Sequence, residues 1–204
     1  NLCLKSDFVA KSQELIIRFE TDKLFKQEIV TNKDWKLVAY TLDSETAQGK
    51  FKVTVKVEGQ VATINWQLKR SDGKEQTAVK EVILEGDEGF VTTGLAATQL
   101  LVLQKIIATR MKENKKTFLA LDPTNIDKPL VELTVEKLSS VKVKSGSDVL
   151  EAQRASVKIG GEDFKLELLY KDTTLWGITA ESGTSKTLVY RQDLFPKGFE
   201  VLGP

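Results

Sequence analysis

The fold is decided by residues 51–69, which read FKVTVKVEGQVATINWQLK. Apolar residues occupy every second position on each side of Gly59-Gln60, and Lys, Thr, Asn, Gln or Glu fill the positions between them. Because a period of two places alternate side chains on opposite faces of a strand, each run predicts a strand with one buried face. Gly59-Gln60 supplies the turn, so the stretch predicts an antiparallel hairpin.

The same alternation continues along the chain in both directions. Ser71-Asp72-Gly73-Lys74 contains an Asp-Gly pair that suits a tight hairpin turn. Before this region, weaker strand signals lie at residues 15–19, 29–30 and 35–42. After it, strands are predicted at 79–84, 117–121, 131–135, 141–143, 155–159, 164–170, 175–178 and 188–190, and the chain ends in a tail that contains Pro196-Lys197-Gly198. Gly160-Gly161 and residues 171–174 predict two of the turns between these strands.

The period changes to a helical one in the middle of the chain. Thr92 and Thr93 are N-cap candidates, and no proline follows before Lys112, so we predict a helix over about 93–112. The apolar positions extend well beyond one stripe, which requires cover over most of the helix circumference. Residues with helical spacing on the apolar face are Leu100, Leu103, Ile107 and Met111.

These patterns predict a mainly β fold. We expect an antiparallel meander of roughly ten to twelve strands, curved around one central α-helix as a half-barrel or open barrel. No linker rich in Pro, Gly or Ser divides the chain. We therefore expect residues 1–204 to form a single domain, with the helix at about 93–112 between two β-meander halves.

Composition excludes several kinds of chemistry. Lys plus Arg is 30 and Asp plus Glu is 29, so the net charge of +1 gives no field that would attract nucleic acid. Histidine is absent, which removes Ser-His-Asp and Cys-His activation and any histidine-ligated zinc. The one cysteine, Cys3, allows no internal disulfide. We predict no enzyme activity, no catalytic residue, no metal site and no cofactor.

Two acidic clusters are interpreted as turns. Asp122, Asn125 and Asp127 lack the spacing of a calcium loop, and we expect local side-chain hydrogen bonds to the backbone there. Glu85, Asp87 and Glu88 lie at a glycine-flanked turn, where solvated acids are expected. The most apolar stretch, residues 95–108, is interrupted by Thr, Gln and Lys, so no membrane span is predicted.

Two stretches resemble a known group of proteins. They are the apolar run at residues 95–111 between two meanders, and residues 164–178, which read FKLELLYKDTTLWGI. Together they resemble the bacterial lipoprotein-carrier (LolA/LolB-like) periplasmic half-barrels and related uncharacterised envelope families. The resemblance implies a periplasmic or otherwise extracytoplasmic location, with a signal peptide removed, and an apolar ligand or an envelope protein partner.

The predicted function follows from the space between helix and sheet. If the side chains do not fill it, a slot remains for a lipid or acyl ligand, and the chain is a non-enzymatic cell-envelope binding or carrier protein. The alternative is a structural or interaction protein with a filled core, in which a strand edge or surface recruits a protein partner. The residues predicted to line the slot are Val53, Val55, Ile64, Trp66, Leu100, Leu103, Ile107, Leu166, Leu168 and Trp176.

Overall fold

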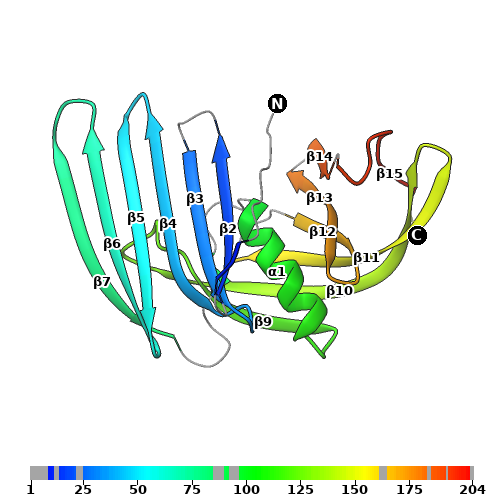
Figure 1. The fold of residues 1–204 in the computed structure, drawn as a ribbon, viewed down its shortest axis with the longest axis horizontal. Helices are drawn as coiled ribbons and strands as arrows, with labels where there is room; N and C mark the ends of the chain where they lie inside the picture. The colour runs from blue at the N-terminus through cyan, green and yellow to red at the C-terminus, as the bar shows by residue number, and fades with distance from the viewer. Residues whose placement is uncertain are drawn as a thin grey trace. The chain divides into compact units, whose positions relative to one another are not determined.

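A computed structural model describes residues 9–11, 14–21, 25–84, 90–91, 97–160, 165–182, 185–191 and 193–202 (Figure 1). These residues form one helix and fifteen strands. The helix is α1, Ala97–Thr109. The strands are β1 Val9–Lys11, β2 Glu14–Thr21, β3 Phe25–Asn32, β4 Leu37–Thr46, β5 Gly49–Glu58, β6 Val61–Arg70, β7 Glu75–Ile83, β8 Phe90–Val91, β9 Lys115–Leu121, β10 Leu130–Ser145, β11 Asp148–Ile159, β12 Lys165–Lys171, β13 Thr174–Ser182, β14 Ser185–Tyr190 and β15 Glu200–Val201.

The chain divides into two compact units. Unit 1 consists of Asn1–Val102 and Leu119–Val131, and unit 2 consists of Leu103–Phe118 and Glu132–Pro204. The prediction that residues 1–204 form a single domain stays a prediction.

Unit 1 contains a seven-stranded sheet in which each strand pairs antiparallel with its neighbour in sequence, in the order β1 to β7 (Figure 1). The predicted hairpin at residues 51–69 is confirmed as β5 and β6, with Val55 opposite Ile64. Val55 also pairs with Tyr40 on β4, and all three side chains are buried. The alternate side chains of β5 are half-buried or exposed, so the sheet buries one face, as its period of two predicts.

Two glycines close the hairpins on either side of β6. Gly59 and Gly73 have φ angles of 63° and 84°, a region that glycine enters without a steric penalty. The Asp-Gly turn predicted at residues 71–74 is confirmed, because Arg70 donates its backbone N–H to the Lys74 carbonyl at 2.8 Å.

The prediction of a strand beginning at Trp35 is wrong by two residues, since β4 begins at Leu37. Trp35 lies in the turn between β3 and β4 with φ of 60°, outside the strand region. The Asn32 side-chain oxygen accepts the backbone N–H of Asp34 at 2.9 Å and of Lys36 at 3.0 Å. This local hydrogen bonding favours the turn over the strand propensity of tryptophan.

The second sheet has the order β14-β13-β12-β11-β10-β9-β8, and β15 pairs with β10. The predicted strands at 131–135 and 141–143 are one continuous strand, β10, whose register against β11 shifts between Leu138 and Val141. A β-bulge of this kind bends a strand without ending it. In unit 1, β8 pairs parallel with the end of β9, Phe90 opposite Ala120, which is an exception to the antiparallel pattern.

The helix predicted over about 93–112 is found as α1, which ends at Thr109 rather than at about 112. Both N-cap candidates, Thr92 and Thr93, lie outside the described residues. From Leu100 to Ile107 only Leu101 and Lys105 are partly exposed, and the other six residues are buried. The predicted cover over most of the helix is therefore confirmed for these residues.

An aromatic cluster forms the core of unit 2 beside the chain end. The rings of Trp176 and Phe195 meet edge to face with centroids 5.3 Å apart, and those of Phe195 and Phe199 with centroids 4.7 Å apart. Tyr190 stacks on Phe199 at 5.6 Å. The sequence predicts a tail at Pro196-Lys197-Gly198, whereas the phenylalanines on either side of it are buried among Val141, Val143, Ala152 and Leu169.

The predicted fold class is confirmed. The described residues are mostly β-strand, with one helix and no closed barrel. The strands number fifteen rather than ten to twelve, because three short strands, β1, β8 and β15, carry no alternation signal in the sequence.

Replacing Phe195 with alanine should destabilise the protein by about 3–5 kcal/mol, because it removes a buried ring from the aromatic cluster. Urea unfolding followed by tryptophan fluorescence measures this change. The matched control is Leu194→Ala, whose side chain is 40% exposed and whose loss should cost no more than about 0.5 kcal/mol. Equal effects of the two substitutions would contradict the assignment of residues 195–199 to the core.

Candidate functional site

A pocket of about 340 Å³ lies within unit 2. Its lining comes from the last turn of α1, from β10, β11 and β12, and from the turn between β12 and β13. The lining residues are Ile107, Ala108, Lys137, Gln153, Tyr170, Asp172 and Thr173. A volume near 300 Å³ is at the lower end of the range for small-molecule sites.

Three of the lining residues, Ile107, Ala108 and Tyr170, bring apolar or aromatic surface to the pocket. Ile107 is fully buried and Tyr170 is 4% exposed, while Ala108 beside them is exposed. The methyl group of Ala108 fills little space, so the helix leaves room there for a ligand.

The turn that borders the pocket, Lys171–Thr174, is fixed by hydrogen bonds from two elements. Gln104 on α1 donates Nε2–H to the Asp172 carbonyl at 3.2 Å, and Lys105 donates from Nζ to the Thr173 carbonyl. Asp172 donates its backbone N–H to Oε1 of Gln153 on β11 at 3.2 Å. These bonds hold Asp172 at φ of 51°, an uncommon conformation for a residue with a side chain.

Gln104 is the polar residue with the most unusual surroundings near this pocket. Its side chain is fully buried, and its Oε1 has no hydrogen-bond partner among the described residues. Burying an amide oxygen without a hydrogen-bond partner costs free energy. The hydrogen bond that Gln104 Nε2 donates to the turn offsets part of this cost.

Lys137 supplies a positive charge to the pocket. Its Nζ donates to the carbonyl of Met111, just after α1, and its backbone N–H donates to the Asn114 carbonyl at 2.7 Å. The bond to Met111 places the ammonium just beyond the end of the helix. An ammonium has three donors, so after the bond to Met111 it keeps two for a ligand or water.

Burial shifts the pKa values of two groups at this site. It raises the pKa of Tyr170, so the phenol stays protonated at neutral pH. Burial lowers the pKa of Lys105, and the nearby positive charge of Arg191 lowers it further.

The lining contains few groups that take part in acid–base chemistry. Asp172 is its single carboxylate, so the pocket has no carboxylate pair of the kind that glycosidases use. A neutral tyrosine is a poor general base. No group of histidine, cysteine or carboxylate side chains able to hold a metal ion occurs in the described part of the chain.

Of the ten residues predicted to line a slot, Ile107 lines this pocket. In unit 1, Val53 pairs with Trp66 and Val55 with Ile64 across β5 and β6. Trp176 lies in the aromatic cluster, 5.3 Å from Phe195. The others are buried, Leu100 in unit 1 and Leu103, Leu166 and Leu168 in unit 2. Assembly of the ten into one slot stays a prediction.

Sequence reasoning missed most of the pocket lining. Tyr170 and residues 171–174 were interpreted only as a strand end and a turn, and Lys137 and Gln153 carry no spacing signal. The predicted turn at Asp122 is confirmed, since its Oδ1 accepts from the backbone N–H of Thr124 at 3.1 Å. Glu85, Asp87, Glu88 and Cys3 lie outside the described residues.

The helix of the described residues has 13 residues, and no helix there combines the length and apolarity needed to cross a membrane.

No protein-family model matches the chain, and no curated protein matches it. Among solved structures, the chain is similar to a β-barrel-like protein of the domain of unknown function DUF1849 from Brucella abortus, with a TM-score of 0.46 and 10% sequence identity. The similarity covers 92% of this chain and 79% of that one.

The substitution Arg191→Leu should raise the pKa of Lys105, because it removes the positive charge of the Arg191 guanidinium near the Lys105 ammonium. The pKa should still remain below its ordinary value, since burial is the larger cause of its depression. Titration of the Lys105 side chain by NMR measures the change. The control Arg191→Lys keeps a positive charge and should leave the Lys105 pKa as low as in the original chain. If Arg191→Leu does not raise the Lys105 pKa either, burial alone lowers it.

Proposed function

We propose that this chain is a non-enzymatic cell-envelope binding or carrier protein whose unit 2 pocket takes a lipid-like, single-chain ligand with an anionic or hydrogen-bond-accepting head. The observation that carries the proposal is the mixed lining of the pocket. Its apolar and aromatic residues, here called the apolar wall, are Ile107, Ala108 and Tyr170, and its polar residues, here called the polar wall, are Lys137, Gln153, Asp172 and Thr173.

The apolar wall supplies the affinity. Removing apolar surface from water contributes roughly 25 cal/mol per Å², and this gain needs no bond chemistry. A volume of about 340 Å³ holds a head with the first part of a chain better than a whole lipid. We therefore expect a fatty acid or a similar amphiphile to enter head first, with the rest of its chain outside the pocket.

The polar wall selects the head. Lys137 keeps donors after its bond to Met111, and Gln153 uses Oε1 for the backbone of Asp172, so its side-chain NH₂ group remains a donor. Both groups donate, and a carboxylate or phosphate accepts. A charge-assisted hydrogen bond to such a head is stronger than a neutral one.

Filling the pocket tests this function. Ala108→Trp places an indole where the ligand would lie, and it should weaken binding of a fluorescent fatty acid about tenfold or more. Titration of protein purified without detergent measures the dissociation constant. Thr109→Trp is the matched control, since Thr109 is exposed on the same helix and does not line the pocket.

The proposal is overturned if the fatty acid does not bind, or if both tryptophan variants bind it as well as the original chain. The corresponding fatty alcohol keeps the chain and loses the charge. It should bind more weakly than the acid, because it no longer pairs with Lys137.

The location in the cell envelope, periplasmic or otherwise extracytoplasmic, belongs to the same proposal and is supported by the resemblance to lipoprotein carriers. When the chain is expressed from its own gene, it should appear in the fraction that osmotic shock releases from the cells. Immunoblots against the chain and against a cytoplasmic marker enzyme provide the measurement. If the chain stays in the cells together with the marker enzyme, the proposed envelope location is wrong. The test of the pocket is not affected by that result.

A further inference from the structure

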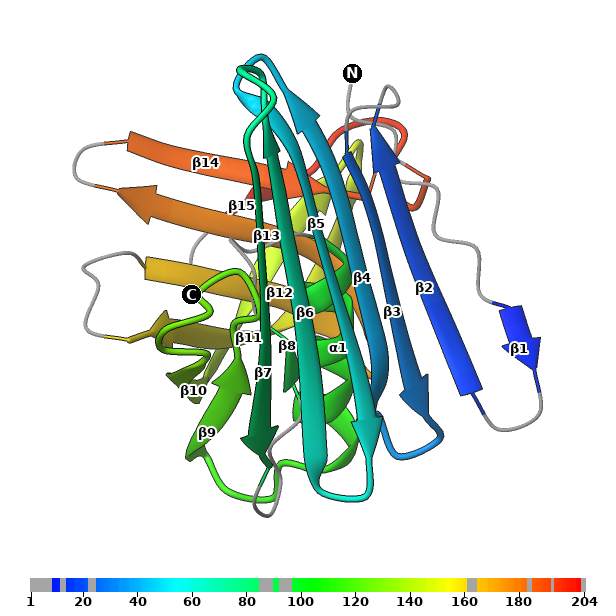
Figure 2. The ribbon, with the colours of Figure 1, turned by 90° about the vertical axis from the view of Figure 1, so that its left-hand side faces the viewer.

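Strand β7 is one of the two edge strands of the unit 1 sheet, and β1 is the other (Figure 2). It pairs with β6 without a register shift, from Lys69 opposite Glu75 to Val61 opposite Ile83. An outermost strand has backbone groups on one side that no neighbouring strand satisfies.

The hydrogen bonds at the two ends of this pairing show which residues of β7 point outward. Leu84 donates its backbone N–H to the Gln60 carbonyl at 2.7 Å, and Arg70 donates to the Lys74 carbonyl at 2.8 Å. Both pairs continue the β6–β7 register, and hydrogen-bonded pairs alternate with non-hydrogen-bonded pairs in an antiparallel ladder. The even-numbered residues of β7 therefore bond to β6. The odd-numbered residues direct both N–H and C=O away from the sheet.

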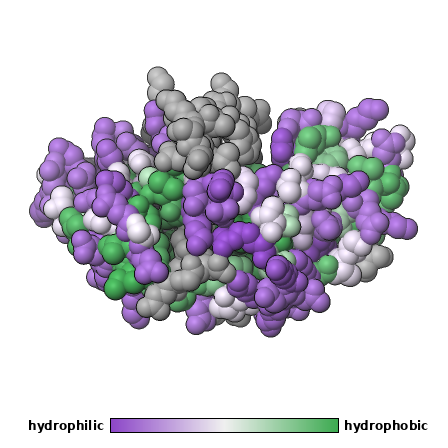
Figure 3. All heavy atoms as spheres, turned by 60° about the horizontal axis from the view of Figure 1, so that its bottom comes forward, coloured by the Kyte–Doolittle hydropathy of each residue, from purple (hydrophilic) through white to green (hydrophobic). Residues whose placement is uncertain are grey.

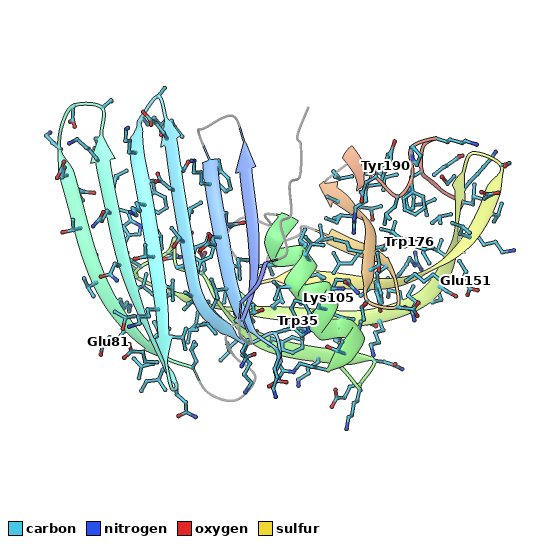
Figure 4. All side chains as sticks on the ribbon, viewed as in Figure 1. Trp35, Glu81, Lys105, Glu151, Trp176 and Tyr190 are labelled. Carbon is cyan, nitrogen blue, oxygen red and sulfur yellow. The ribbon has the colours of Figure 1, made fainter. Side chains whose placement is uncertain are left out.

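The odd-numbered residues also have exposed side chains. Val79 is 68% exposed and Ile83 is 64% exposed, and Val61, opposite Ile83 on β6, is 37% exposed. Apolar side chains reach the surface among polar ones over the strands at the left of Figure 3. Glu81 lies between Val79 and Ile83 on the same face and is labelled in Figure 4. No ion pair of Glu81 occurs within the described residues.

Strand β7 lacks two common protections of an edge strand, because it has no proline and no bulge. Its one lysine, Lys80, is an even-numbered residue, and its Nζ donates to the carbonyl of Asp127 at 2.8 Å. The Lys80 ammonium is therefore bound within unit 1, and the charged residues among the odd-numbered positions are Glu75 and Glu81.

A second copy of β7 does not suit this edge. An antiparallel β7–β7 pair either places Glu81 opposite Glu81 or Glu75, or places Val79 or Ile83 opposite a polar residue. Like charges directly opposite one another destabilise a strand pair.

We propose that β7 is a strand-addition site for an extended segment of a different protein. The segment pairs antiparallel with β7 and has apolar residues opposite Val79 and Ile83 and a lysine or arginine opposite Glu81. Main-chain hydrogen bonds from the odd-numbered residues give the affinity, and the alternate side chains give the specificity. This inference does not depend on the ligand pocket, which lies in unit 2.

The probe is a blocked peptide, Val-Thr-Lys-Thr-Val-Thr-Thr-Thr-Lys, designed to place its first valine opposite Ile83 and its first lysine opposite Glu81. Amide hydrogen exchange by NMR is the readout. In the free protein the amides of Thr77, Val79 and Glu81 should exchange fast and those of their even-numbered neighbours slowly. The peptide should slow the odd-numbered amides.

Two variants, each with a control, distinguish strand addition at β7 from nonspecific binding of the peptide. Val79→Pro removes one outward N–H and leaves the β6 pairing intact, so peptide binding should fall about tenfold or more, while Val79→Thr should retain it. Glu81→Lys should weaken binding of the peptide about two- to fivefold. It should strengthen binding of a second peptide in which glutamate replaces both lysines. Glu132→Lys, the same charge change at an exposed position of β10, should alter neither.

Three outcomes overturn the proposal. The first is that the peptide does not slow exchange of the odd-numbered amides, or that it binds the Val79→Pro variant as tightly as the original chain. The second is protection of these amides by phosphatidylglycerol vesicles and not by the peptide. The third is a concentration-dependent dimer that Val79→Pro abolishes, which would make a second copy the occupant.

Discussion

The pairing register of neighbouring strands is the constraint on which both sheets depend. In unit 1, Val55 lies between Tyr40 and Ile64, and the three side chains share one buried face. Because successive side chains alternate in direction, a slip of one residue would move this whole set to the solvent side. The glycine turns set the register, since Gly59 and Gly73 adopt positive φ angles that keep the loops between β5, β6 and β7 short.

The sequence predicts the fold correctly where strands have one solvent-exposed and one buried face, as at residues 51–69. Prediction failed where contacts outside the local stretch decide the outcome. Trp35 has a strand former's side chain, yet the Asn32 side chain holds it in a turn. Phe195 and Phe199 flank a proline and a glycine, so no period indicates a buried segment, and only the cluster with Trp176 shows that they are core.

The candidate pocket was much less predictable than the fold. Ile107 was identified because helical spacing places it on the core face. Lys137, Gln153 and Asp172 come from different elements, and their proximity depends on how those elements pair. Gln104 was interpreted as an interruption of an apolar run, although it is fully buried and holds the turn at Asp172. Polar residues of this kind have no periodic signature, because their role is set by a partner 68 positions away.

The aromatic cluster of unit 2 has a consequence for the order of folding during synthesis. From β2 to β7, each strand pairs with the preceding strand, so every hairpin can form soon after it leaves the ribosome. The core of unit 2 joins Val141 to Phe199 and cannot be completed until Phe195 and Phe199 have left the ribosome. Ribosome-bound nascent chains that stop before Phe195 should therefore expose the Trp176 ring and recruit chaperones, even when their first seven strands are already paired.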